Sequence, residues 1–469
     1  MSTKEEQGVD SALYEELGSW HVNTGEETIH AKRMPGRFRN LKWLTSLSWL
    51  VFFFGPYLQY AGRQAILFDI PARKFYIFDI TILPQDVWIL SLILLFFAIL
   101  LAAVTSVAGR MFCGYFCFQT IWTDIFTWIE EKVEGKPVAR HKLDKSPWNF
   151  TKIRIRATKY FFWLLISLFT GISFIAWFTD AFQLWVDLLS LQATATVLIT
   201  LGMFTAGTFI LAGFMREQVC FWLCPYARIQ GVMYDSETIL PTYDTARGEP
   251  RGRLRKGGLV EGNGDCISCN MCVAVCPTGV DIREGQQEGC ITCGLCLDAC
   301  DSVMEKIKKP LGLIRYASLD EMTGKPKIPM FKRIRVLVYI GIMTFALSGI
   351  IYGLLNLGSM ELKVIHERQP LFVLQSDGSI QNKYVIKILN KTDLDEKIKL
   401  TVQGPEGLRV RGAENLLDAG KSHVTPYTIF LNIPKQSLKA ERVPVIFHVE
   451  MTVQKAAVDY ESMFFGPAK

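Results

Sequence analysis

The chain has 469 residues, of which 50% are hydrophobic and only 20% are charged. This mixture argues against a purely soluble protein and indicates apolar membrane spans that alternate with polar domains. The formal net charge at pH 7 is +6. Because the basic residues cluster beside the apolar runs, we assign this excess to membrane topology and not to nucleic-acid binding.

Residues 1–40 form a polar segment that we expect to be a cytoplasmic tail. Its first thirty residues are acidic and contain no apolar stretch of the kind found in a cleavable signal peptide. We therefore expect this tail to be disordered, and we read no function in it.

Five apolar runs approach the length of about 20 residues that a helix needs to cross a bilayer. We expect four spans within residues 41–225, with a cytoplasmic loop at 109–157, and a fifth span within residues 333–358. The first run contains Gly55 and Pro56, so we expect it to kink or to end early. The predicted spans are Leu44–Tyr60, Val87–Val107, Tyr160–Phe178, Ala193–Phe214 and Ile334–Leu357.

The distribution of lysine and arginine predicts the orientation of these spans. Both residues are frequent in segments 109–157 and 226–332, whereas the loop from Phe178 to Ala193 contains neither. We therefore expect the N-terminus and both basic segments in the cytoplasm. Five spans then place the C-terminal part of the chain outside.

Apolar residues recur at helical spacing between Ile121 and Ile129, in the loop after the second span. This pattern predicts a short amphipathic helix on the cytoplasmic membrane face. Packing of the same helix against the bundle explains the pattern equally well. Polar residues nearby, such as Gln119, Asp124 and Arg216, are expected to pair with each other or to line a site.

Two cysteine pairs share the spacing C-x3-C, Cys113 with Cys117 and Cys220 with Cys224, each at the predicted cytoplasmic end of a span. On a helix this spacing puts both thiols on one face, so the two pairs could converge on one four-thiolate site. Soft thiolates favour Cu(I), zinc or an iron–sulfur cluster. We favour a redox or metal site, with copper as a candidate, over buried inert cysteines.

Eight further cysteines repeat the spacing C-x2-C-x2-C-x3-C twice, in a segment that we expect to cover residues 262–309. Bacterial ferredoxins with two [4Fe–4S] clusters have this spacing, and the fourth cysteine of each run ligates the other cluster. We therefore expect two crossed ligand sets: Cys266, Cys269, Cys272 and Cys300 for one cluster, and Cys276, Cys290, Cys293 and Cys296 for the other.

Zinc and disulfide bonds are the alternatives for these eight cysteines. Structural zinc sites use two CxxC pairs separated by a longer segment and not runs of four. Disulfides are disfavoured because we expect this segment in the cytoplasm, where thiols stay reduced. The sequence therefore predicts an inserted ferredoxin-like α+β domain with two clusters.

After the fifth span the apolar residues alternate with a period of two. About seven short strands within residues 362–469, separated by turn residues, predict an all-β sandwich of immunoglobulin type. The segment contains no cysteine and no recognisable catalytic group, so we expect it to bind a partner. The predicted fold is a multi-domain membrane protein: a five-helix transmembrane bundle, the inserted ferredoxin domain and this C-terminal sandwich.

Several runs resemble the cytochrome c oxidase accessory protein family (CcoG/FixG/RdxA), which are membrane-bound polyferredoxins. The resemblance covers nearly the whole chain from about Arg37, and Phe118 departs from it where the family usually has proline. The runs that carry the resemblance are Cys113–Cys117 with Gln119 and Trp122, Arg216–Cys220, Cys224–Arg228, Gly248–Gly252, Cys300–Met304, Gly312–Tyr316 and Lys387–Thr392.

The resemblance implies a protein of the bacterial inner membrane, with its C-terminal domain in the periplasm, that assists the assembly of a cbb3-type oxidase. Oxidase subunits or copper chaperones would be its partners. It also implies an oxidoreductase that reduces Cu(II) to Cu(I). Two other functions stay open: a quinol-linked electron conduit of a respiratory chain, and an assembly scaffold whose clusters are structural.

Overall fold

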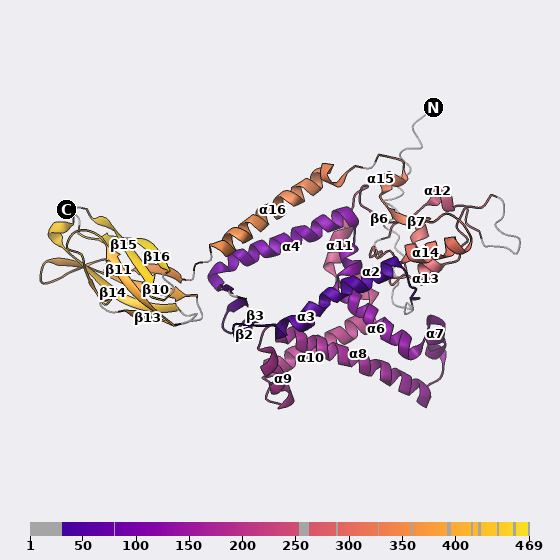
Figure 1. The fold of residues 1–469 in the computed structure, drawn as a ribbon, viewed down its shortest axis with the longest axis horizontal. Helices are drawn as coiled ribbons and strands as arrows, with labels where there is room; N and C mark the ends of the chain where they lie inside the picture. The colour runs from indigo at the N-terminus through magenta and orange to yellow at the C-terminus, as the bar shows by residue number, and fades with distance from the viewer. Residues whose placement is uncertain are drawn as a thin grey trace. The chain divides into compact units, whose positions relative to one another are not determined.

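The computed structural model describes residues 31–467 with gaps at 79, 253–261, 288, 327, 357, 359, 392–394, 414–415, 421–423, 439 and 454–455. The described residues form two compact units, one up to Ile350 and one from Ile351 onward (Figure 1). The predicted tail lies outside the described residues as far as residue 30.

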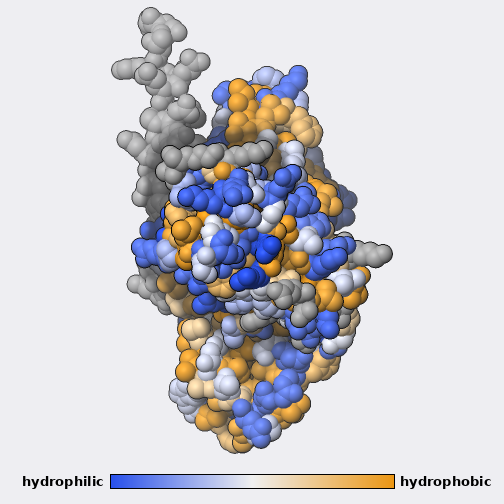
Figure 2. Space-filling model, turned by 90° about the vertical axis from the view of Figure 1, so that its left-hand side faces the viewer, coloured by the Kyte–Doolittle hydropathy of each residue, from blue (hydrophilic) through white to orange (hydrophobic). Residues whose placement is uncertain are grey.

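Four helices of the first unit are long and apolar enough to cross a membrane. They match four of the five predicted spans, and the count of five is not confirmed. The four are α4 (Val87–Ala108), α8 (Phe150–Ala176), α10 (Ala195–Ile210, with a π-helical end at Leu211–Met215) and α16 (Ile334–Leu355). Figure 2 shows hydrophobic residues among hydrophilic ones on the face of the molecule that it draws. Many apolar residues of the four helices are exposed, such as Leu94 and Phe97 of α4, although half of the apolar stretch of α8 is buried. This exposure is consistent with a membrane protein.

The first predicted span, Leu44–Tyr60, is a broken helical segment. Helix α2 (Arg37–Ser46) continues through a 3₁₀ turn into α3 (Leu50–Phe54), and a second 3₁₀ turn contains Gly55 and Pro56. A Cβ at Gly55 would lie 2.6 Å from the ring of Trp177, and the indole Nε1 of Trp177 donates to the carbonyl of Phe52. The helical segment therefore ends beside Trp177, at the C-terminal end of α8. The expected break at Gly55 and Pro56 is present.

Helix α6 (Phe118–Glu134) explains the helical pattern in the loop after α4. Its apolar face, including Trp122 and Phe126, is buried against Trp163 of α8 and Ala212 at the end of α10. The pattern therefore reflects packing against the bundle. Other short elements of this unit include α5 (Met111–Tyr115), α7 (Pro137–Lys145), α9 (Ala181–Leu189), α11 (Pro225–Val232), the strand pair β1 (Gln59–Tyr60) and β2 (Arg63–Gln64), and a sheet of β3 (Ile66–Asp69), β4 (Lys74–Ile77) and β5 (Ile80–Ile82).

An antiparallel strand pair brackets the eight-cysteine segment. Strand β6 (Leu240–Tyr243) pairs with β7 (Ile314–Ala317), so residues on both sides of the predicted 262–309 segment belong to the same module. Between the strands lie α13 (Met271–Ala274) and α14 (Leu295–Lys306), which each begin inside a cysteine motif. Tyr243 and Ile314 are buried together with Cys266 and Cys272.

The second unit is a sandwich of two antiparallel sheets, as the period-two pattern predicts. Buried and exposed residues alternate along β11, and Tyr384, Phe447 and Phe464 lie in the core between the sheets. Nine strands lie in its described residues, where about seven were expected. One sheet contains β8 (Met360–His366), β9 (Val373–Leu374), β10 (Ser379–Asn390), β12 (Arg409–Arg411) and β14 (Val424–Pro434), and the other β11 (Glu396–Gln403), β13 (Leu417–Ala419), β15 (Arg442–Met451) and β16 (Ala457–Phe465).

We expect Phe447→Ala to destabilise this sandwich by about 3–5 kcal/mol, because it removes a fully buried ring from the core. Chemical unfolding of the C-terminal unit, followed by circular dichroism, measures the change. Lys399→Ala on the exposed face of β11 is the control and should stay within about 0.5 kcal/mol of the parent. Equal stability of the two variants would show that the core is assigned wrongly.

Candidate functional site

The two cysteine motifs have the same backbone path. Ser268 and Thr292, at the same position in each motif, have φ values of 50° and 54°. Two residues further on, Asn270 and Gly294 are left-handed as well, with φ values of 55° and 71°. Asparagine and glycine are the residues that tolerate this region best. The repeat in the sequence therefore extends to the conformation of both loops.

Each loop borders a cavity that gathers four cysteines. One cavity is lined by Cys266, Cys269, Cys272 and Cys300, which we call the outer set. The other is lined by Cys276, Cys290, Cys293 and Cys296, which we call the inner set, and Cys272 also borders it. These groups are the two sets of the crossed assignment.

The chemistry of both sets fits iron–sulfur clusters, because each cavity offers four soft ligands among mostly apolar side chains, with Asn270 and Arg283 as polar exceptions in the outer cavity. Burial raises the pKa of Cys272 to about 11, and the pKa values of Cys290 and Cys300 to about 12. These thiols are therefore protonated without a metal, and binding of iron must release their protons.

The two C-x3-C pairs do not lie on continuous helices, so the expected placement of both thiols on one helix face is wrong. Cys113 lies in α5, and Cys117 is the extended residue that precedes α6. Cys220 lies in a π-helical turn (Val219–Leu223), and Cys224 is the extended residue that precedes α11. Both pairs follow the same pattern, although Phe118 stands in one where Pro225 stands in the other.

The thiols of the two pairs nevertheless influence one another. Burial raises the pKa of Cys113 and raises that of Cys220 to about 12. Cys117 and Cys224 raise both pKa values further, and Cys113 also raises that of Cys220. The guanidinium of Arg110 opposes this effect at both thiols. Among the described residues, no group of three or more His, Cys, Asp or Glu side chains is arranged to hold a single metal ion.

The buried side chain of Gln230 on α11 holds Arg110 and Cys113 in place. Its Oε1 accepts a hydrogen bond from Arg110 Nε at 3.2 Å and from Cys113 Sγ at 3.3 Å. Gln230 also donates to Thr105 of α4, which joins α11 to this helix. The sequence predicts neither the position of Arg110 beside Cys113 nor its hydrogen bond with Gln230. In the sequence, Arg110 is only one of several basic residues after the second span.

Residues 289–295, which carry Cys290 and Cys293 of the inner set and which we call the inner loop, pack directly against α5. A Cβ at Gly114 would lie 2.6 Å from the carbonyl oxygen of Ile291, so only glycine permits this approach. Tyr115 donates from its hydroxyl to the carbonyl of Cys293 at 2.9 Å, and the backbone N–H of Arg110 donates to Thr292 Oγ1 at 3.1 Å. Cys113 and Cys293 are buried in one apolar cluster.

The inner loop also contacts the second cysteine pair. A Cβ at Gly289 would lie 2.7 Å from the ring of Phe221, which directly follows Cys220. The inner set therefore lies on the side of the ferredoxin module that contacts both C-x3-C pairs.

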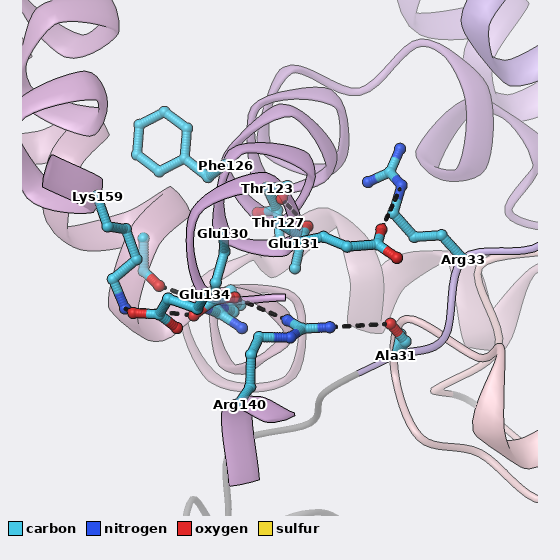
Figure 3. Close-up of polar contacts among 12 residues, drawn as sticks. Ala31, Arg33, Thr123, Phe126, Thr127, Glu130, Glu131, Glu134, Arg140 and Lys159 are labelled. Carbon is cyan, nitrogen blue, oxygen red and sulfur yellow. Dashed lines mark hydrogen bonds and ion pairs between the residues drawn. The ribbon is translucent and has the colours of Figure 1, made fainter. Parts of the chain in front are cut away.

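A buried carboxylate on α6 collects cations from three other elements. Glu130 accepts from Arg140 and Arg216 at 3.0 Å, and Lys159 lies 3.3 Å from Glu130 and 2.8 Å from Glu134. Figure 3 shows Arg140 and Lys159 turned toward this end of α6. Burial opposes ionisation, but these cations outweigh it and lower the pKa of Glu130 from 4.5 to about 2.

The N-terminal segment forms a second ion cluster on the same helix. Asp124 pairs with Arg33, Arg39 and Lys42 at 3.0–3.2 Å, and these cations hold its pKa below the usual range despite burial. Arg33 also approaches Glu131 (Figure 3). Polar residues near the span ends therefore form ion pairs, as expected: Asp124 pairs with cations of the N-terminal segment, and Arg216 pairs with Glu130.

The same segment is attached to the ferredoxin module. The carboxylate of Asp298 on α14 accepts from the backbone N–H groups of Phe38 and Arg39 at the start of α2, at 2.9 and 3.3 Å. The Phe38 ring packs edge-on against Tyr316 of β7. Residues 31–42 thus tie α14 to α6, and no pattern in the sequence predicts the role of Asp298.

Comparison with known proteins identifies relatives over most of the chain. Nitrogen fixation protein FixG of Rhizobium meliloti (strain 1021) is 39% identical over 87% of this chain and 86% of its own length. Protein RdxB of Cereibacter sphaeroides is 38% identical over 94% and 96%, and protein RdxA of the same organism is 40% identical over 81% and 83%.

Three family models match separate parts of the chain. A 4Fe-4S dicluster domain matches residues 215–319, which contain both cysteine sets and the second C-x3-C pair. A 4Fe-4S binding domain matches residues 90–137, which contain the first pair. An IG-like fold at the C-terminus of FixG matches residues 350–467. The iron–sulfur and immunoglobulin-like predictions are therefore confirmed.

We expect Glu130→Gln to destabilise the protein by about 3–5 kcal/mol, because it leaves three buried cations without their shared anion. The pKa of Glu130 is about 2 when folded and 4.5 when unfolded, so its contribution is complete above about pH 4.5 and decreases as the pH falls toward 2. Thermal unfolding in detergent measures both effects.

The neighbouring Glu131→Gln is the matched control. Glu131 lies 3.7 Å from Arg33 and is partly exposed, so its loss should cost less than about 1 kcal/mol. Equal effects of the two substitutions, or a Glu130 effect that does not change below pH 4.5, would contradict the assignment of Glu130 as the buried hub.

Proposed function

The chain belongs to the FixG family of 4Fe-4S electron-transfer proteins, and on this premise we propose that it reduces Cu(II) to Cu(I) for the assembly of a cbb3-type oxidase. The supporting observation is the contact between the inner loop and α5, which joins a cluster-binding loop to a buried thiol, Cys113. Copper is the substrate of this reaction and not a resident cofactor.

The eight cysteines of the outer and inner sets would hold the two [4Fe–4S] clusters, which supply one electron at a time. Each Cu(II) takes one electron and becomes Cu(I), and a cluster held by these cysteines would supply that electron. The side chains near Cys113 receive the metal. Thiolates bind Cu(I) better than Cu(II), so product formation is favoured where they lie.

Arg110 would favour the thiolate form of the receiving cysteines once copper displaces their protons. Its guanidinium is buried and opposes the rise that burial causes in the pKa values of Cys113 and Cys220. Gln230 keeps the guanidinium in place through its amide oxygen.

We further propose an inner-membrane protein that crosses the bilayer five times, first through the broken segment α2–α3. The ferredoxin module would lie in the cytoplasm, as the basic residues beside the spans favour. The immunoglobulin-like unit would then lie in the periplasm and bind oxidase subunits or a copper chaperone.

Purified protein should contain about eight irons and eight acid-labile sulfides, the sum for two cubane clusters. Replacing Cys300 by serine should reduce the iron content and alter the signal of one cluster, because Cys300 lines only the outer cavity. Iron and sulfide analysis with electron paramagnetic resonance (EPR) measures this. Zinc without labile sulfide would contradict the cluster assignment.

Replacing both Cys113 and Cys117 by serine should abolish Cu(II) reduction while both cluster signals persist, because neither residue lines a cluster cavity. A Cu(I) chelator assay with dithionite-reduced protein measures the rate. Met111→Leu in the same short helix is the control and should retain activity, since it preserves the side-chain volume. Unchanged copper reduction in the cysteine variant would refute the proposal.

A further inference from the structure

The two cysteine loops share one backbone path but differ in exposure. In the inner loop, residues 291–295 are all buried, because α5 covers Ile291 and Cys293 and the N-terminal segment covers Gly294. In the outer loop, the equivalent residues 267–271 are all partly or fully exposed, and Cys269 and Asn270 are the most exposed. A second protein can therefore approach the outer set but not the inner one.

We propose that residues 267–271 are the surface at which a soluble one-electron carrier protein docks, and that electrons pass from the outer set to the inner set and then to a Cu(II) ion at the C-x3-C thiols. The carrier loses one electron and the acceptor gains one, with no bond formed or broken on the way. Only the last acceptor rests on the proposed copper reduction.

The shared wall between the cavities supports this order. Cys272 lines both cavities, so the two sets are neighbours with a single side chain between them. The inner set in turn lies in one apolar cluster with Cys113. The chain thus places the outer set, the inner set and Cys113 in sequence, from the exposed loop to the thiols at the ends of α4 and α10.

The test is freeze-quench EPR of the full chain in detergent, mixed with reduced flavodoxin as the carrier protein or with dithionite as the small reductant. The signal that Cys269→Ser alters identifies the outer set. Flavodoxin should reduce the outer set before the inner set. Reduction of the inner set first would overturn the proposal, whatever the outcome of the copper assay.

Asn270→Asp tests the docking surface without removing a ligand, because aspartate also tolerates the left-handed backbone at this position. The added charge should slow reduction by the acidic flavodoxin several-fold, more at low salt, and leave reduction by dithionite unchanged. Gln192→Glu, an exposed residue after α9, adds the same charge as a control and should change neither rate. Equal slowing with both reductants, or no slowing with flavodoxin, would overturn the proposal.

Discussion

The close approach of the inner loop to α5 is the contact on which the rest of the structure depends. Gly114 permits it, since any side chain there would collide with the backbone at Ile291. Tyr115 and Arg110 then fix the loop by hydrogen bonds to Cys293 and Thr292. This contact converts a ferredoxin-like module, which alone would be a carrier of electrons, into part of a path that ends at buried thiols.

Buried ion pairs hold the elements on either side of this contact. Asp124 and Glu130 lie on α6 and together bind cations from the N-terminal segment, α7, α8 and the end of α10. Burying an unpaired charge costs several kcal/mol of folding free energy, so loss of either carboxylate would leave its buried cations unpaired and destabilise the fold. Asp298 extends the arrangement to α14 by capping α2, and the module cannot shift from α5 without breaking these interactions.

Local patterns in the sequence predict the parts of this molecule that depend on local chemistry. The spacing of the cysteines predicts both cluster sets, and the alternation of apolar residues from Tyr384 onward predicts the sandwich. Both features depend on residues that are close together in the sequence. The break at Gly55 and Pro56 is predicted for the same reason. The spacing of Cys113 and Cys117 misleads, since the helix ends between them. The pairing of β6 with β7 and the cap at Asp298 join residues far apart in the chain, so no local pattern indicates them.

Under the proposed function, the bound clusters would deliver electrons to Cu(II) at the thiols beside the inner loop. The most direct measurement is a single-turnover experiment in which reduced protein, freed of excess reductant, is mixed with Cu(II) and frozen at intervals for EPR. The account predicts that the reduced-cluster signals and the Cu(II) signal disappear together, with one electron lost from the clusters for each Cu(I) formed. Clusters that stay reduced while Cu(II) persists, or Cu(II) that is reduced while the clusters keep their electrons, would contradict it.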